Sequence, residues 1–130
     1  MILEHNDFLK DSFKPINIII DGVKTKKFVA SDDCFAYGTS YICNMNHRGY
    51  IINDPYFDAK APNFFKPNLL GGSVQFEIDL SKHECGCMST LYLVGMPAKT
   101  RYGFFNNKID DYFYCSAKKK EAYCPEMDLM

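Results

Sequence analysis

SVQFEIDL, residues 73–80, is a stretch in which apolar and polar side chains alternate cleanly. Successive side chains of a β-strand point to opposite faces of the sheet, so the alternation predicts a strand with one apolar face and one polar, solvent-exposed face. Residues 90–96, TLYLVGM, also read as a strand. We expect the two strands to be adjacent and antiparallel, linked by a turn over 81–89. Their principal core contacts are then expected to come from Phe76, Ile78, Leu91 and Leu93.

The rest of the chain favours strands over helices. Its 9 tyrosines and 11 phenylalanines are residue types that strands prefer, and no long helical period is visible. Only residues 1–14 have helical character, which predicts a short N-terminal arm at most. The fold class predicted is therefore all-β, of antiparallel strands. Further strands, separated by turn signals such as Asp21-Gly22, are predicted at 16–20, 27–30, 39–43, 49–52 and 111–115.

Length and charge limit what the chain can be. With 130 residues, 47% of them hydrophobic, the chain is expected to form one domain, residues 1–130, with a buried core. A formal net charge of −1, with the basic residues spread along the chain, argues against nucleic acid as a partner. Apolar runs such as residues 18–20 are far shorter than the roughly 20 residues of a membrane-spanning helix. The first residues also lack the features of a signal peptide, so an exported form would carry its leader outside this sequence.

The 6 cysteines form an even set, which suits an oxidising compartment. Structural disulfides, reduced core thiols and a metal site are all considered, and the spacing favours disulfides because finger-like pairs are missing. Cys34 with Cys43 and Cys115 with Cys124 would close natural local loops. We predict the second of these bridges because its cysteines bracket a polar loop. No metal or cofactor is predicted, since the histidines are scattered and Gly71-Gly72 does not open a helix.

Two carboxylates near the end of the chain are the first candidates for chemistry. Glu126 and Asp128 are two residues apart, so in a strand both side chains project to the same face. Two carboxylates held together disfavour double ionisation, which is useful for acid and base work. Glu77 and Asp79 have the same spacing, and an exposed polar face of a strand explains either pair equally well.

Two blocks of sequence resemble glycoside hydrolase family seven, the cellobiohydrolase and endoglucanase family. The first, residues 71–97, is similar to the family's F-x-x-D-x-S strand, Cys-Gly turn and L-Y-x-V-x-M strand. The second starts at Tyr114-Cys115-Ser116-Ala117, which resembles the family's Y-C-D-A motif. It ends in CPEMDLM, residues 124–130, which is similar to the catalytic C-x-E-x-D-x-x-E strand. The two blocks follow one another in the family's order, and the first 70 residues show no such similarity.

The resemblance implies a partial jelly-roll sandwich of the concanavalin type and a site for β-1,4-glucan. It implies that Glu126 stands at the position of the nucleophile in a retaining reaction, with Asp128 as the neighbour that tunes its charge. The family's acid/base would follow Met130, and the chain has no tryptophan on which sugars could stack. We expect the pair to lie on a concave sheet face, with no third carboxylate at about 5–5.5 Å from Glu126. Without a positioned acid, hydrolysis loses about 10²–10⁴-fold, so the chain alone is expected to be inactive.

Two hypotheses of function follow. In the first, the chain is part of a secreted glucanase that further sequence completes. In the second, it is a non-catalytic structural or glycan-binding subunit of an extracellular or surface assembly. A partial sandwich leaves strand edges and an apolar face open, so a partner chain or self-association is expected in both cases.

Overall fold

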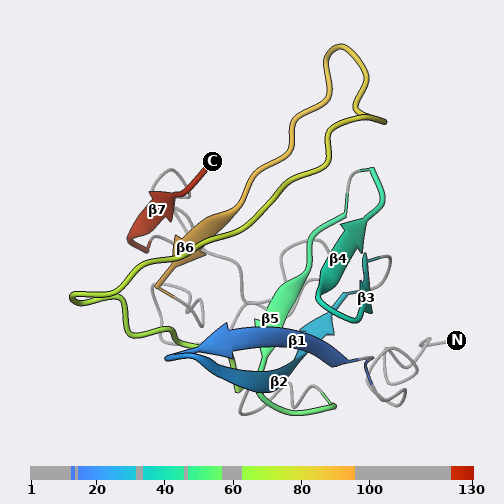
Figure 1. Ribbon diagram of the computed structural model, residues 1–130. Coiled ribbons are helices and arrows are strands. Elements are labelled where there is room, and N and C mark those ends of the chain that lie inside the picture. Colours follow the sequence, from blue (N-terminus) through green and yellow to red (C-terminus); the bar gives the residue numbers. More distant parts are fainter. Residues whose placement is uncertain (1–12, 14, 32–33, 46, 57–62, 96–123) are drawn as a thin grey trace, which may run out of the picture. The chain divides into compact units, whose positions relative to one another are not determined.

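The computed structural model describes residues 13, 15–31, 34–45, 47–56, 63–95 and 124–130. Contacts divide the chain into two units, Met1–Lys66 and Pro67–Met130, each of which is described by itself. Every regular element in the described residues is a β-strand, and every strand pairing is antiparallel, so the all-β prediction is confirmed (Figure 1). The jelly-roll arrangement, the single domain and the N-terminal arm over 1–14 stay predictions, and most of that arm lies outside the described residues.

A three-stranded sheet with the order β1-β2-β5 organises the first unit. β1 (Pro15–Ile20) and β2 (Val23–Ala30) form a hairpin in which Ile20 pairs with Val23. Asp21 and Gly22 make the two-residue turn at φ of 52° and 78°, the left-handed values that such tight hairpin turns require. β5 (Tyr50–Ile52) pairs with the far end of β2. The predicted strands at 16–20, 27–30 and 49–52 therefore exist, and the second is the end of a longer strand.

A second hairpin packs against this sheet. β3 (Cys34–Tyr37) and β4 (Ser40–Cys43) pair through a turn at Gly38, and the Asn17 amide donates to the Gly38 carbonyl oxygen at 2.8 Å. The prediction of a strand at 39–43 is confirmed from residue 40, whereas β3 was not predicted. Side chains from β1, β2 and β3 form the buried cluster of the unit, made by Ile16, Val29, Cys34 and Ala36.

Asparagine side chains fasten residues 63–65 to the end of β5. The Asn53 side-chain amide donates to the Asn63 side-chain oxygen at 2.9 Å and to the Phe64 carbonyl at 3.1 Å. Lys27 donates to the Asn53 side-chain oxygen at 2.7 Å, and its ammonium group lies 5.0 Å from the centre of the Phe65 ring. The buried Phe64 ring packs edge-on to Tyr50 at 5.7 Å. A network of side-chain hydrogen bonds and an aromatic contact therefore hold residues 63–65 against the end of β5.

The second unit contains a two-stranded ladder. β6 (Tyr92–Val94) pairs with β7 (Glu126–Asp128), so the strand predicted at 90–96 exists over its centre and the strand assumed at 124–130 exists over residues 126–128. The predicted strand at 111–115 lies outside the described residues. No helix long and apolar enough to cross a membrane occurs in the part of the chain that the structure describes.

The prediction that residues 73–80 form a strand paired with 90–96 is wrong. The segment carries no strand assignment, and β6 pairs with β7 instead. Phe76 and Ile78 are 41% and 44% exposed, so they are not core residues, and Leu91 and Leu93 are only half-buried. The physical reason is that alternation fixes the two faces of a strand but not its neighbour. Within the described residues, no sheet covers the apolar face of this segment.

Candidate functional site

The β6–β7 ladder places an aromatic ring and two carboxylates on one face. Tyr92 is directly opposite Asp128, and Val94 is directly opposite Glu126. Opposed residues of an antiparallel pair share a face, and residues two apart along a strand do so as well. Tyr92, Val94, Glu126 and Asp128 therefore line the same side of the ladder, with Leu93 and Met127 on the other. We call these four residues the tyrosine face.

Backbone hydrogen bonds continue the ladder beyond its strands. The Gly95 amide donates to the Pro125 carbonyl oxygen at 2.9 Å, and the Leu129 amide donates to the Leu91 carbonyl oxygen at 2.9 Å. A β-carbon on Gly95 would lie 3.1 Å from the Pro125 ring, so glycine allows the close approach of the two chains here. Cys124, 5% exposed and disulfide-bonded, holds the start of β7. Both ends of the tyrosine face are therefore anchored.

An open depression of about 260 Å³ lies at the Gly95 end of the ladder. Most of its lining is apolar, and Glu126 is the one charged residue among the described residues that line it. The lining residues are Leu93, Val94, Gly95, Pro125, Glu126 and Met127.

The two predicted site residues are brought together as their spacing required. Glu126 is half-buried on β7, and Asp128 is exposed on the same face. The concave shape of the face and the absence of a third carboxylate near Glu126 stay predictions. Tyr92 was not predicted as a site residue. Its sequence signal was weak, because only the register of β6 against β7 places it beside Asp128.

The second carboxylate pair belongs to a different environment. Glu77 and Asp79 are exposed on the unpaired segment 73–80. Hydrogen bonds from the side chain and then the backbone amide of Ser81 lower the pKa of Asp79 below its ordinary value of 3.8, and the charge of Lys82 adds a smaller effect. The Ser81 amide lies 2.8 Å from the Asp79 carboxylate. Asp79 therefore stabilises a local turn, and this pair lacks the aromatic partner that Tyr92 gives to Asp128.

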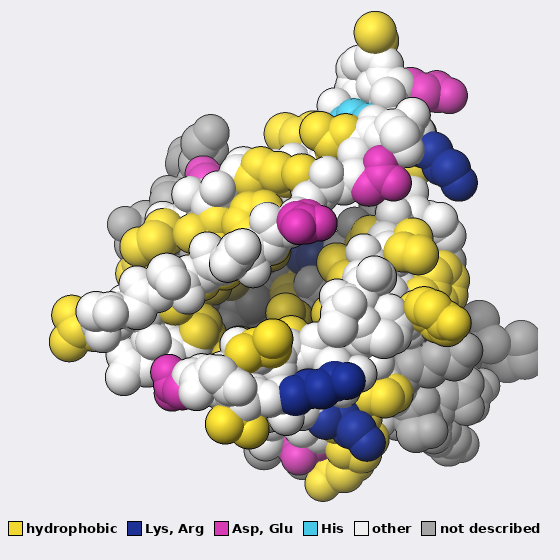
Figure 2. Space-filling model, in the orientation of Figure 1, with side chains coloured by type: hydrophobic (Ala, Val, Ile, Leu, Met, Phe, Trp, Pro, Cys, Tyr) yellow, Lys and Arg dark blue, Asp and Glu magenta, His cyan; other side chains and the backbone are white. Residues whose placement is uncertain are grey.

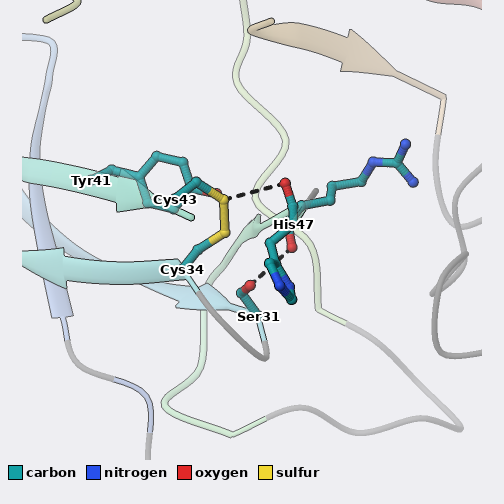
Figure 3. The surroundings of a disulfide bond; sticks show 6 residues. Ser31, Cys34, Tyr41, Cys43 and His47 are labelled. Carbon is teal, nitrogen blue, oxygen red and sulfur yellow. Dashed lines mark hydrogen bonds between the residues drawn. A yellow bond between two sulfur atoms is a disulfide. The ribbon is translucent and has the colours of Figure 1, made fainter. Parts of the chain in front are cut away.

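The cysteines divide into bonded and free groups. Cys34 and Cys43 form a disulfide across β3 and β4, one of the two local loops considered (Figure 3). The Tyr41 hydroxyl donates to the Cys43 sulfur at 3.4 Å, and that sulfur also lies 3.4 Å from the His47 carbonyl oxygen. Cys124 is also disulfide-bonded, but Cys115 lies outside the described residues, so the predicted bridge between them stays a prediction.

Cys85 and Cys87 are free thiols on either side of Gly86, whose φ is 82°. The Cys87 amide donates to the Glu84 carbonyl oxygen at 3.2 Å, which closes the turn. Among the described residues, no group of three or more His, Cys, Asp or Glu side chains is arranged to hold a metal ion. The two thiols therefore flank the glycine of a turn.

Comparison of the chain with protein-family models, with characterised proteins and with solved structures finds no match.

Proposed function

We propose that this chain is a non-catalytic glycan-binding subunit that binds a β-1,4-glucan at the tyrosine face. The observation that carries the proposal is the register of β6 against β7, which sets Tyr92 opposite Asp128 and on the same face as Glu126. The resemblance of residues 71–97 and 124–130 to family seven of the glycoside hydrolases points to the same class of ligand.

The chemistry of the face suits a sugar chain. A pyranose ring has an apolar face of C–H groups and a rim of hydroxyl donors. An aromatic ring offers a flat apolar surface to the C–H face of the sugar. The carboxylates of Glu126 and Asp128 accept hydrogen bonds from its hydroxyl groups. Hydrogen bonds to a charged group contribute about 1.5–3 kcal/mol each, so two carboxylates can position a sugar.

Binding is better supported than hydrolysis. A retaining glycosidase requires a second carboxyl group about 5–5.5 Å from its nucleophile. Residues two apart on a strand are separated by roughly 6.6 Å along the backbone, and the resemblance gives Asp128 a tuning role rather than the role of proton donor. Glu126 is therefore proposed here as a ligand-binding group.

The place of action proposed is extracellular or at a cell surface. The support for this is the Cys34–Cys43 disulfide, since such bonds persist in oxidising compartments.

The test is titration of the 130-residue chain with cellohexaose by isothermal calorimetry. Tyr92→Leu keeps an apolar side chain on β6 but removes the ring, and we expect affinity to fall about tenfold, equivalent to 1.4 kcal/mol. Tyr92→Phe keeps the ring and should bind nearly as well as the original chain. Asp128→Asn should also weaken binding about tenfold, because the charged acceptor is lost. Tyr37→Leu is the matched control, since Tyr37 is a strand tyrosine of the first unit that is 82% exposed.

Three results would overturn the proposal. The first is that the chain shows no detectable binding, and the second is that Tyr37→Leu and Tyr92→Leu weaken binding equally. The third is release of reducing sugar from a soluble β-glucan at a rate that Glu126→Gln abolishes, which would make the chain a catalyst.

A further inference from the structure

The segment 73–80 exposes an unusual row of apolar side chains. Val74, Phe76, Ile78 and Leu80 are 44%, 41%, 44% and 49% exposed. In Figure 1 the segment is one arm of a long loop whose other arm leads into β6, and Figure 2 shows hydrophobic side chains gathered along this loop. The row alternates with Gln75, Glu77 and Asp79, all exposed. The side-chain pattern is therefore that of a strand.

The segment carries no strand assignment, and its backbone groups are open to pairing. No backbone hydrogen bond joins residues 73–79 to another described residue, and the Leu80 carbonyl oxygen accepts only the turn bond from His83 at 2.9 Å. The segment contains neither proline nor glycine. Unpaired amide and carbonyl groups in a row, with side chains alternating between two faces, are what an added strand recognises.

The charge of the polar face determines which strand could pair with the segment. Glu77 and Asp79 make this face acidic, and Lys82 follows outside the row. Like charges directly opposite one another destabilise a strand pair, and opposite charges stabilise it. A second copy of the segment is a poor partner. In the antiparallel pairing centred on Glu77, and in the parallel pairing in register, Glu77 would lie opposite Glu77.

We propose that residues 73–80 bind an extended segment of a partner protein by strand addition, and that the partner segment alternates apolar residues with lysine or arginine. Its backbone pairs with the open edge of residues 73–80. Its apolar side chains cover Phe76 and Ile78, and its basic side chains lie opposite Glu77 and Asp79. This site is separate from the tyrosine face and does not depend on glucan binding.

The test uses a fluorescent eight-residue peptide that alternates valine and lysine, titrated with the 130-residue chain and followed by anisotropy. A peptide that alternates valine and glutamate has the same strand propensity and the opposite charge, so it is the matched control. We expect the lysine peptide to bind at least about tenfold more tightly at low salt, and the difference to shrink as salt is raised. Hydrogen exchange should show new protection of the amides of residues 74–80 when the lysine peptide is bound.

Variants separate strand addition from loose charge attraction. Ile78→Pro removes one backbone donor from an exposed position and should weaken binding at least about tenfold. Phe76→Ser should weaken it about tenfold, whereas Ile19→Ser, at an apolar position of β1 that is 75% exposed, should leave it unchanged. Glu77→Lys leaves one positive and one negative side chain on the polar face, so it should abolish the preference between the two peptides.

The proposal is overturned if both peptides bind equally, if protection appears outside residues 74–80, or if neither peptide binds. Sedimentation showing that the chain self-associates, with loss of the association in Phe76→Ser, would also overturn it and make a second copy the occupant.

Discussion

Removing the Cys34–Cys43 disulfide should cost the first unit about 3 kcal/mol of stability. The two cysteines are 9 residues apart in the sequence, and the chain-entropy relation for a loop of this size gives about 2.6 kcal/mol. Cys34 is also 7% exposed and belongs to the buried cluster with Ile16 and Val29. Losing its sulfur adds about 0.8 kcal/mol, the value of one buried CH₂ group. The perturbation is the double substitution Cys34→Ala with Cys43→Ala.

Urea unfolding, with hydrogen exchange to report on the first unit, measures this loss. The control is the double substitution Cys85→Ala with Cys87→Ala, which also removes two sulfur atoms but no bond, and which should change stability by less than about 0.5 kcal/mol. Faster exchange should appear first in β3 and β4, the strands that the bond joins. If both double variants lose the same stability, or if β3 and β4 keep their protection without the bond, the reasoning is refuted.

Two other predictions concern packing and charge. Ile52, 1% exposed, is the most deeply buried large side chain described, so Ile52→Ala should lower the free energy of unfolding in urea by about 2–5 kcal/mol. The control is Ile51→Ala, on the opposite face of the strand, which should lower it by less than about 1 kcal/mol. Ser81→Ala should raise the pKa of Asp79 toward 3.8, measured by carboxyl NMR titration, whereas Ser73→Ala should not. Because the pKa of Asp79 is lowered by folding, its contribution to stability is present above pH 3.8 and is lost as pH falls through the folded pKa. An unchanged Asp79 pKa in Ser81→Ala would contradict the assigned cause.

Local chemistry explains what could be predicted about the fold. The Asp21-Gly22 pair adopts the left-handed backbone of a two-residue turn, so the hairpin of β1 and β2 follows from neighbouring residues alone. The Cys34–Cys43 loop is short, and the side-chain period of a strand places Glu126 and Asp128 on one face. β3 was not predicted, because its four residues, CFAY, are all apolar and show no alternation between two faces.

The sequence by itself determined the all-β class, the positions of most strands and the shared face of the two carboxylates, and it offered the Cys34–Cys43 loop as one of two local candidates for a disulfide. Each of these depends on residues a few positions apart. Only the tertiary structure decided that β6 pairs with β7, that Tyr92 therefore lies opposite Asp128, and that residues 73–80 carry no strand partner among the described residues. Those features depend on pairing between distant segments. A strand's alternation specifies which face is apolar, but every strand offers the same row of amide and carbonyl groups, so its pattern does not specify its neighbour.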